Sequence, residues 1–275
     1  MHKFGSLYVE ADSFFHRLNP GVKLSMFVAW LVAVFMFLDL RVSIGLLITG
    51  FIFLWFAKIP YRIARNLFIA IGVFNLINAL FILLLAPDYG VTLTGVNDIV
   101  LDCFGLKIYT ATLTYILVIS LKYLSLLPLT IIFIFTTHPG KFAASLNKVG
   151  IPYKLAYTVN IIFRYFPDIR EEFKIIANAQ AARGFSFGKD EPSKLRRIKN
   201  LFNITVPLIN SALARIDKVS NAMELRSFGK NKTRTWYNQS DYSLIDMVTL
   251  LFIIVIFFLL LYFRLHSTGR FITIS

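Results

Sequence analysis

The chain has 275 residues, of which 57% are hydrophobic and only 16% are charged, and its formal net charge is +14. Soluble domains carry about 25% charged residues, and here the apolar residues gather in long runs, so a membrane protein is the first hypothesis. In such a protein an excess of Lys and Arg marks cytoplasmic loops. The positive charge is therefore weaker evidence for nucleic-acid binding than it would be in a soluble protein.

Two short apolar runs, residues 24–38 and 42–57, open the series of predicted spans. Each is a little shorter than the roughly 17–25 residues that a transmembrane helix needs, so we expect flanking residues such as Lys23 to snorkel. Only Asp39, Leu40 and Arg41 separate the runs, which predicts a tight helical hairpin. The polar residues before the first run lack a signal-peptide pattern, so we expect that run to be retained.

A basic connector, residues 58–66, leads into a third predicted span at residues 67–86. Asn75 and Asn78 lie three residues apart within this span and therefore share a face. Amide side chains in hydrocarbon usually bond to a neighbouring helix. We expect the pair to do so here.

The fourth apolar stretch, residues 109–136, follows a polar and mostly acidic loop at residues 87–108. As one helix it would be about 42 Å long at 1.5 Å per residue, against a hydrocarbon core of about 30 Å. We therefore expect it to tilt, protrude or bend, with Lys122 and Pro128 as the places to bend. A lysine at mid-span is costly unless it is paired or faces a polar interior. It indicates either a helix that ends near a wet cleft or a polar contact between spans.

Residues 137–245 differ in character, because they hold 18 Lys and Arg against 8 Asp and Glu while remaining rich in apolar residues. A final apolar run, residues 247–262, is a fifth span candidate. The positive-inside rule places the basic segment and the N-terminus in the cytoplasm and the C-terminus outside. The sequence thus predicts an all-α polytopic membrane protein. It divides into a membrane domain with about four spans (1–136), a cytoplasmic or interfacial domain of amphipathic helices (137–245) and a C-terminal span with a short tail (246–275).

Two amphipathic helices are predicted inside the basic segment, at residues 169–183 and 206–226. In each helix a set of mostly apolar residues recurs at the i, i+3 and i+4 spacing of one helix face. These positions are Phe173, Ile176, Ala177 and Gln180 in the first helix, and Leu208, Ala212, Ile216, Val219, Met223 and Arg226 in the second.

Both predicted helices end in an arginine, a small residue and a phenylalanine, residues 183–185 and 226–228. Gly184 is a natural stop for the first helix. A single arginine at a helix C-terminus complements the helix dipole. Two parallel endings favour a further role, because arginine is well suited to docking on carbonyls and carboxylates of a partner.

No catalytic pattern accompanies these helices, and we expect no catalytic, cofactor-binding or metal-binding residues. There is no HExxH or GxSxG sequence, and residues 184–189 imitate a phosphate-binding loop with the wrong spacing. Asp168, Glu171 and Glu172 interleave with basic residues and predict a solvated helix face. The basic run 194–199 favours anionic lipid headgroups over nucleic acid. One cysteine, Cys103, and four scattered histidines predict neither an internal disulfide nor a metal site.

Several stretches along nearly the whole chain resemble the transmembrane T component of energy-coupling factor (ECF) transporters. They are Ser-Phe-Phe-His-Arg-Leu-Asn-Pro at 13–20 followed by Lys23, Thr-Thr-His-Pro at 136–139, Gly-Ile-Pro at 150–152, Phe-Arg-Tyr-Phe-Pro at 163–167 followed by Glu171 or Glu172, and Ala-Gln-Ala-Ala-Arg-Gly at 179–184. That family's two coupling helices end in Ala-Arg-Gly-like triplets. The first is intact here as Ala182, Arg183 and Gly184. The second is Leu225, Arg226 and Ser227, with leucine where alanine is usual.

The resemblance implies a subunit without ATPase activity in the plasma membrane of a prokaryote. Its coupling helices would sit in grooves of two cytoplasmic ABC-type ATPases, with Arg183 and Arg226 as anchors. Their apolar faces would hold a separate substrate-binding S component for a vitamin or a transition-metal ion. The resemblance implies no cofactor. Besides the ATPases and the S component, the only partner that we expect is membrane lipid.

Two other functions stay open on the residues alone. A membrane enzyme acting on lipids or isoprenoids would need an acidic or His-rich site, for which only Asp168, Glu171 and Glu172 are available. A substrate-binding permease would place polar residues around a cavity at mid-membrane, and Asn75, Asn78 and Lys122 are the candidates.

Overall fold

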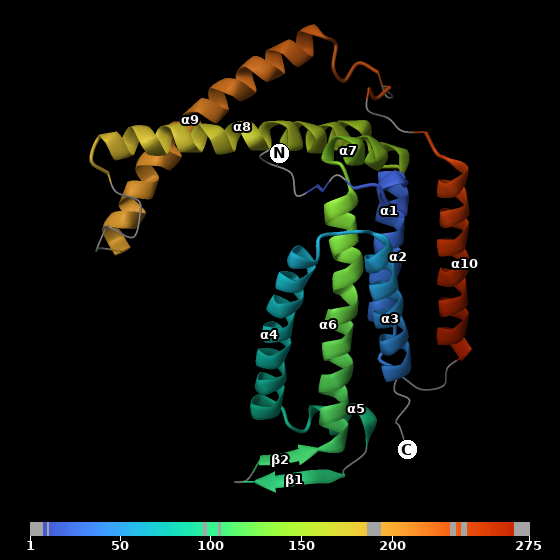
Figure 1. Ribbon diagram of the computed structural model, residues 1–275. Helices are drawn as coiled ribbons and strands as arrows, with labels where there is room; N and C mark the ends of the chain where they lie inside the picture. Colours follow the sequence, from blue (N-terminus) through green and yellow to red (C-terminus); the bar gives the residue numbers. More distant parts are fainter. Residues whose placement is uncertain are drawn as a thin grey trace. The chain divides into compact units, whose positions relative to one another are not determined.

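The computed structural model describes residues 8–9, 11–95, 98–103, 106–185, 194–231, 235–237 and 241–266. The chain divides into two compact units. We call residues 7–138 with 240–275 the membrane unit, and residues 1–6 with 139–239 the basic unit. Figure 1 labels the elements of both.

The membrane unit is a bundle of apolar helices around one central helix, α6 (Thr110–Thr136). Helices α2 (Pro20–Met36), α3 (Leu40–Phe56) and α4 (Tyr61–Leu85) pack against α6, and α10 (Leu244–His266) packs against α2. A short helix, α1 (Phe14–Arg17), precedes α2. The all-α fold class is confirmed.

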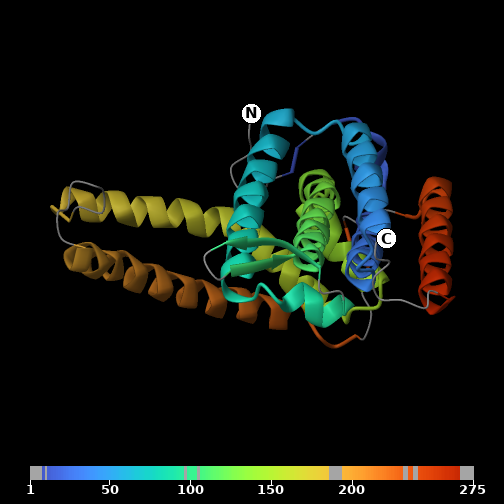
Figure 2. The same ribbon diagram turned by 90° about the horizontal axis from the view of Figure 1, so that it is seen from below.

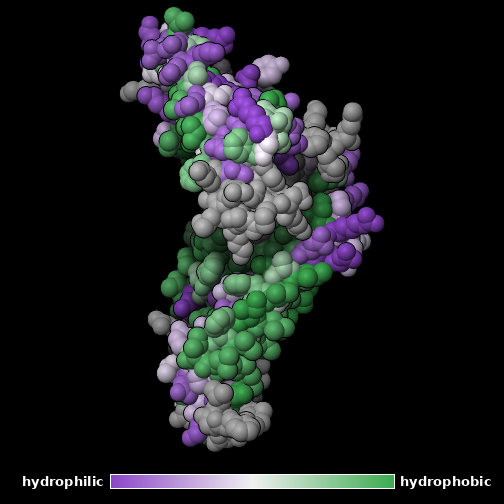
Figure 3. All heavy atoms as spheres, turned by 90° about the vertical axis from the view of Figure 1, so that its left-hand side faces the viewer, coloured by the Kyte–Doolittle hydropathy of each residue, from purple (hydrophilic) through white to green (hydrophobic). Residues whose placement is uncertain are grey.

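By length and composition, α4, α6 and α10 can each cross a membrane, and α2 and α3 are shorter apolar helices of 17 residues. The outward side chains of these helices are apolar as well, as the green surface over α4 in Figure 3 shows. So continuous an apolar surface would be unfavourable in water but is favourable in the hydrocarbon core of a membrane.

The link between α2 and α3 is the tight hairpin that the sequence predicts. Asp39 is the N-cap of α3, and its side chain accepts a hydrogen bond from the backbone N–H of Arg41 at 2.9 Å. At the other end of α3, the structure differs from the predicted connector. Helix α4 begins at Tyr61, directly after Pro60, so most of residues 58–66 already belong to it.

The predicted acidic loop is more ordered than its polarity suggested. It contains the short helix α5 (Tyr89–Thr94) and an antiparallel hairpin of β1 (Ile99–Cys103) and β2 (Leu106–Tyr109). In the register of the hairpin, Asp102 lies opposite Lys107. The loop carries two short strands that the predicted fold did not include.

Helix α6 continues unbroken through Pro128. The proline ring lies against α3 at Gly50, where an added Cβ would come within 3.0 Å of the ring. A glycine at this position lets the two helices approach closely, as small residues do between transmembrane helices. Pro128 therefore serves helix packing.

The basic unit contains α7 (Pro139–Lys148), α8 (Tyr153–Ala182) and α9 (Lys194–Leu225). Figure 2 shows that α8 and α9 run in opposite directions, and Figure 1 shows that they cross at an angle. Both helices begin well before the predicted residues 169 and 206, and each continues through an internal proline, Pro167 or Pro207. The predicted starts were therefore wrong, because the helices extend toward their N-termini beyond the amphipathic stretches on which the prediction rested.

Candidate functional site: two arginine-ended helices

Helix α8 ends in a turn that reverses the backbone. Ala182 is the last helical residue, Arg183 caps the helix, and Gly184 adopts a left-handed conformation with φ +85°. The N–H of Gly184 donates to the carbonyl of Ala181 at 3.0 Å, and that of Phe185 donates to the carbonyl of Gln180 at 3.1 Å. These two bonds define a Schellman motif.

Helix α9 ends in the same motif. The N–H of Ser227 donates to the carbonyl of Glu224 at 2.8 Å, and that of Phe228 donates to the carbonyl of Met223 at 2.9 Å. Ser227 adopts the left-handed conformation with φ +54°, which costs a residue with a Cβ about 1 kcal/mol. The two triplets thus occupy equivalent positions, with Arg226 at the cap like Arg183.

The arginine of each ending, Arg183 or Arg226, and the residue before it are exposed. Leu225, the residue that departs from the usual alanine, is 88% exposed and packs little against its own unit. Each ending therefore places an exposed arginine next to the same backbone turn, and a guanidinium group suits docking on a carboxylate or backbone carbonyl of another protein.

Three contacts along α8 and α9 hold the helices antiparallel. Gln180 Nε2 donates to the backbone carbonyl of Asn203 at 3.4 Å. Nearer the middle, Arg215 forms an ion pair with Glu172 at 2.6 Å and lies 5.7 Å from the ring centre of Tyr165. Phe228 then meets the start of α8. The two arginines consequently lie toward opposite ends of α8, whose 30 residues span about 45 Å.

The acidic cluster on α8 corrects one expectation. Glu172 belongs to no solvated face, because its carboxylate accepts hydrogen bonds from Ser211 and Arg215 on α9. Asp168 and Glu171 are exposed. The cluster therefore braces two helices at Glu172, and its three carboxylates do not converge on a common site.

Each of the two helices leaves an apolar stripe uncovered within the basic unit. The residues of each stripe recur every three, four or seven positions and so lie on one helix face. They are Leu155, Ile162, Phe166, Ile169 and Phe173 on α8, and Phe202, Val206, Ile209, Leu213 and Ile216 on α9, all exposed. The predicted positions Leu208, Ala212, Val219 and Met223 are half-buried, whereas Ile216 belongs to the exposed stripe.

The three polar residues that the sequence offered for a permease, Asn75, Asn78 and Lys122, have different surroundings. Asn75 is buried and donates from Nδ2 to the backbone carbonyl of Ser120 on α6 at 3.3 Å, a contact between helices as expected. Asn78 and Lys122 are half-exposed. Within the described residues, Lys122 makes no side-chain hydrogen bond or ion pair.

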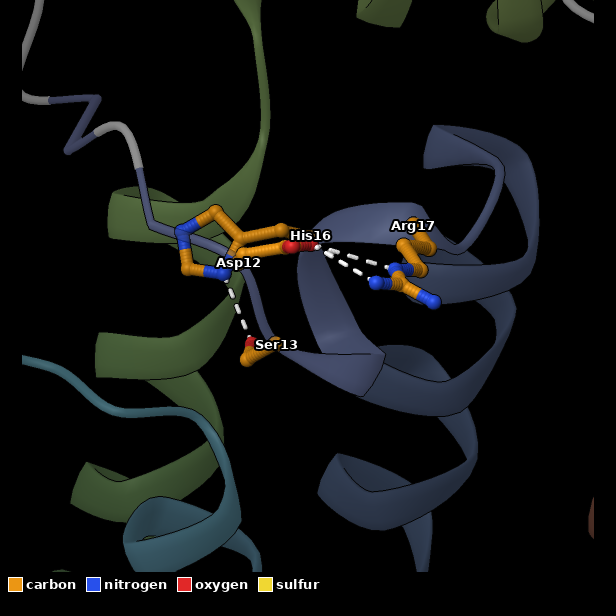
Figure 4. Close-up of polar contacts among 4 residues, drawn as sticks. All are labelled: Asp12, Ser13, His16 and Arg17. Atoms are coloured by element: carbon orange, nitrogen blue, oxygen red, sulfur yellow. Dashed lines mark hydrogen bonds and ion pairs between the residues drawn. The ribbon is translucent and has the colours of Figure 1, made fainter.

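The stretch around α1 carries a serine–histidine pair, drawn in Figure 4. Ser13 Oγ lies 2.7 Å from His16 Nδ1, and His16 Nε2 lies 2.9 Å from the carbonyl oxygen of Val9. Because a carbonyl can only accept, Nε2 carries the hydrogen and Nδ1 accepts from Ser13. Burial lowers the pKa of His16. Ser13 is itself buried, and the pair links α1 to the backbone at Val9.

The residues after α1 join three helices of the membrane unit. Lys23 is only 2% exposed and donates from Nζ to the carbonyl of Thr136, the last residue of α6, at 2.7 Å. The backbone N–H of Asn19 donates to Asp246 of α10 at 2.8 Å. Lys23 therefore does not snorkel as expected, and Asp246 is a buried partner that the sequence reasoning missed.

Other expectations lie partly outside the described part of the chain. The side chains of residues 194–199 are among these, so their contact with lipid headgroups stays a prediction, and most of the loop imitation at 184–189 is outside as well. Among the described residues, no group of three or more His, Cys, Asp or Glu side chains is placed to hold a metal ion.

A family model described as a cobalt transport protein, CbiQ, matches residues 11–237. Relatives similar over most of their length are each named energy-coupling factor transporter transmembrane protein EcfT. The relative from Acidaminococcus fermentans is 30% identical over 274 residues, which cover 94% of this chain and 95% of the relative. The relative from Bacillus selenitireducens is 29% identical and covers 88% and 90%, and that from Bacillus subtilis is 28% identical and covers 94% and 96%.

Proposed function

Because the chain belongs to the CbiQ family of cobalt transport proteins, whose similar members are transmembrane components of energy-coupling factor transporters, we propose that it couples ATP hydrolysis by partner subunits to import. The chain would hydrolyse nothing itself. Two ABC-type ATPases would bind the basic unit, and an S component would carry the substrate, a vitamin or a transition-metal ion.

The observation that carries this proposal is the equivalence of the two arginine endings. Both place an exposed arginine at the cap of the same Schellman turn. Their separation along a helix of about 45 Å suits two docking points on two neighbouring proteins better than one. This equivalence supports our proposal that the triplets 182–184 and 225–227 contact the ATPases.

The exposed apolar stripes of α8 and α9 support a second contact. Each stripe would be costly to leave in water. An S component that packs its own apolar helices on these stripes would cover them. Motion of α8 and α9, driven by the ATPases at the arginine endings, would then reach the S component directly.

The charge distribution supports an orientation in the plasma membrane. Residues 137–245 carry 18 Lys and Arg against 8 Asp and Glu, and such an excess stays on the cytoplasmic side. The basic unit would therefore face the cytoplasm, where ATP is available. Its cations would also meet anionic lipid headgroups.

The test is co-purification of the ATPases with an Arg183→Glu/Arg226→Glu double variant in mild detergent. We expect both ATPases to be lost, because each anchor changes sign. An Arg170→Glu/Lys218→Glu variant is the matched control, since it reverses the same charge at exposed positions within the same helices and should retain the ATPases. Normal assembly and transport by the double variant would refute the anchor assignment.

A further inference from the structure

The chain that follows the α9 ending turns back onto the start of α8. The ring of Phe228 lies 4.8 Å from that of Tyr157 and 5.6 Å from that of Tyr153, measured between centroids. The ring of Trp236 lies 6.1 Å from that of Tyr157. Tyr157 thus contacts two aromatic residues of the segment after α9, Phe228 and Trp236, at distances typical of favourable aromatic pairs.

Polar contacts extend this aromatic group to α7. Trp236 Nε1 donates to Asn147 Oδ1 at 3.2 Å, and Asn147 Nδ2 donates to the carbonyl of Ile151 at 2.9 Å. Asn147 lies at the end of α7, and Ile151 lies in the turn that leads into α8. We call Tyr157, Phe228 and Trp236 the aromatic clasp.

The clasp acts next to one of the two arginine endings only. Phe228 is the last residue of the α9 turn, two positions after Arg226. Phe185 holds the same position in the α8 turn, but it is 37% exposed and makes no ring contact among the described residues. Identical backbone turns are therefore held by different means.

We propose that Tyr157 is a positioning residue, which through the clasp fixes Arg226 relative to the α7–α8 turn. This proposal rests on the proposed function, because it assumes that Arg226 receives force from an ATPase. With the clasp closed, a displacement of Arg226 moves the start of α8. With the clasp open, α9 moves its end alone, and ATP is hydrolysed with less transport.

The first test measures the geometry in the isolated chain and needs no partner. Spin labels at Ile175→Cys and Leu225→Cys, both exposed positions, are placed in a Cys103→Ser background. Phe228, three residues after Leu225, contacts Tyr157, and Tyr157 lies about 27 Å from Ile175 along α8. The two labels are therefore separated by a distance that pulsed electron–electron double resonance can measure. We expect a narrow distance distribution that broadens in Tyr157→Ala and in Phe228→Ala, whereas Tyr157→Phe keeps it narrow.

A second label pair, Ile175→Cys and Leu213→Cys, reports the body of the helix pair near the Glu172–Arg215 ion pair. It should stay narrow in all these variants, which shows that the unit remains folded. Phe185→Ala is the matched control for the first pair and should leave it unchanged. A narrow distribution for the first pair in Phe228→Ala would overturn the proposal.

The second test measures transport per ATP hydrolysed by the reconstituted complex. We expect Tyr157→Ala to retain both ATPases and their hydrolysis but to lose about 10-fold in substrate moved per ATP. Tyr157→Phe should restore the ratio. Unchanged coupling in Tyr157→Ala would overturn the positioning role. A wild-type chain that binds no ATPase would instead refute the proposed function and leave the spin-label result standing.

Discussion

The two arginine endings share a backbone turn, but they differ in the residue at the left-handed position and in the packing of the phenylalanine that follows it. Gly184 fills the left-handed position of the α8 turn without strain, whereas Ser227 fills that of the α9 turn despite its Cβ. The α8 ending is exposed beyond Arg183, and the α9 ending packs Phe228 onto the clasp. The difference shows that the arginine and its turn define the site, while the bracing is adapted to each end.

The α8 ending has a brace of another kind. Pro207 lacks an N–H, so it leaves the carbonyl of Asn203 without its usual partner in α9. Gln180, three residues before Arg183, donates to that carbonyl at 3.4 Å. A proline inside one helix thus provides an acceptor for the end of the other.

The largest expected effect comes from reversing one arginine at a time. Arg183→Glu and Arg226→Glu should each weaken ATPase binding by about 100-fold, because reversing one partner of a docked charge pair costs several kcal/mol. The affinity of the purified ATPases for each variant, measured by surface-immobilised binding, checks this. If one variant binds like the wild type, the endings are not equivalent and only the other is a docking point.

A smaller effect is expected from opening the brace midway between the endings. Glu172→Ala removes the ion pair with Arg215 and the hydrogen bond from Ser211, at a cost of about 1–2 kcal/mol because both charged side chains keep some solvent contact. Thermal unfolding in detergent should show a fall of a few degrees. Glu171→Ala, an exposed neighbour, should change the midpoint little, and an equal fall would remove Glu172 from its bracing role.

The smallest effect distinguishes the turns themselves. Gly184→Ser places a Cβ in a left-handed conformation and should destabilise the α8 ending by about 1 kcal/mol, whereas Ser227→Gly relieves the same strain in the α9 ending. Hydrogen exchange at the amide of Phe185 should therefore be faster in Gly184→Ser than in the wild type. Exchange at the amide of Phe228 should be slower in Ser227→Gly. Changes of the same sign would show that the two turns are not equivalent.

The sequence predicted the helix ends better than their starts. Gly184 and the parallel residues 226–228 are local stop signals, and the structure ends both helices there. Both helices begin earlier than predicted and continue through Pro167 and Pro207, where contacts between α8 and α9 hold the two helices together. Local propensity does not include such tertiary contacts.

Contacts between distant residues were not accessible from sequence periodicity. The bond between Asn19 and Asp246 joins the beginning and end of the membrane unit, and the clasp joins Tyr157 to Trp236. Each depends on the folded chain, so no spacing rule indicates it. The resemblance did include Asn19 and Lys23, but only the structure shows their contacts with Asp246 and Thr136.

Site-specific photocrosslinking tests the central assignment most directly. A photoreactive phenylalanine analogue is placed at Ala182 or Leu225 in the two triplets, and at Ile162 or Ile209 in the apolar stripes, all exposed positions. We expect the triplet positions to form adducts with the ATPases and the stripe positions to form adducts with the S component. Adducts of Leu225 with the S component or with lipid, and none with an ATPase, would contradict the account.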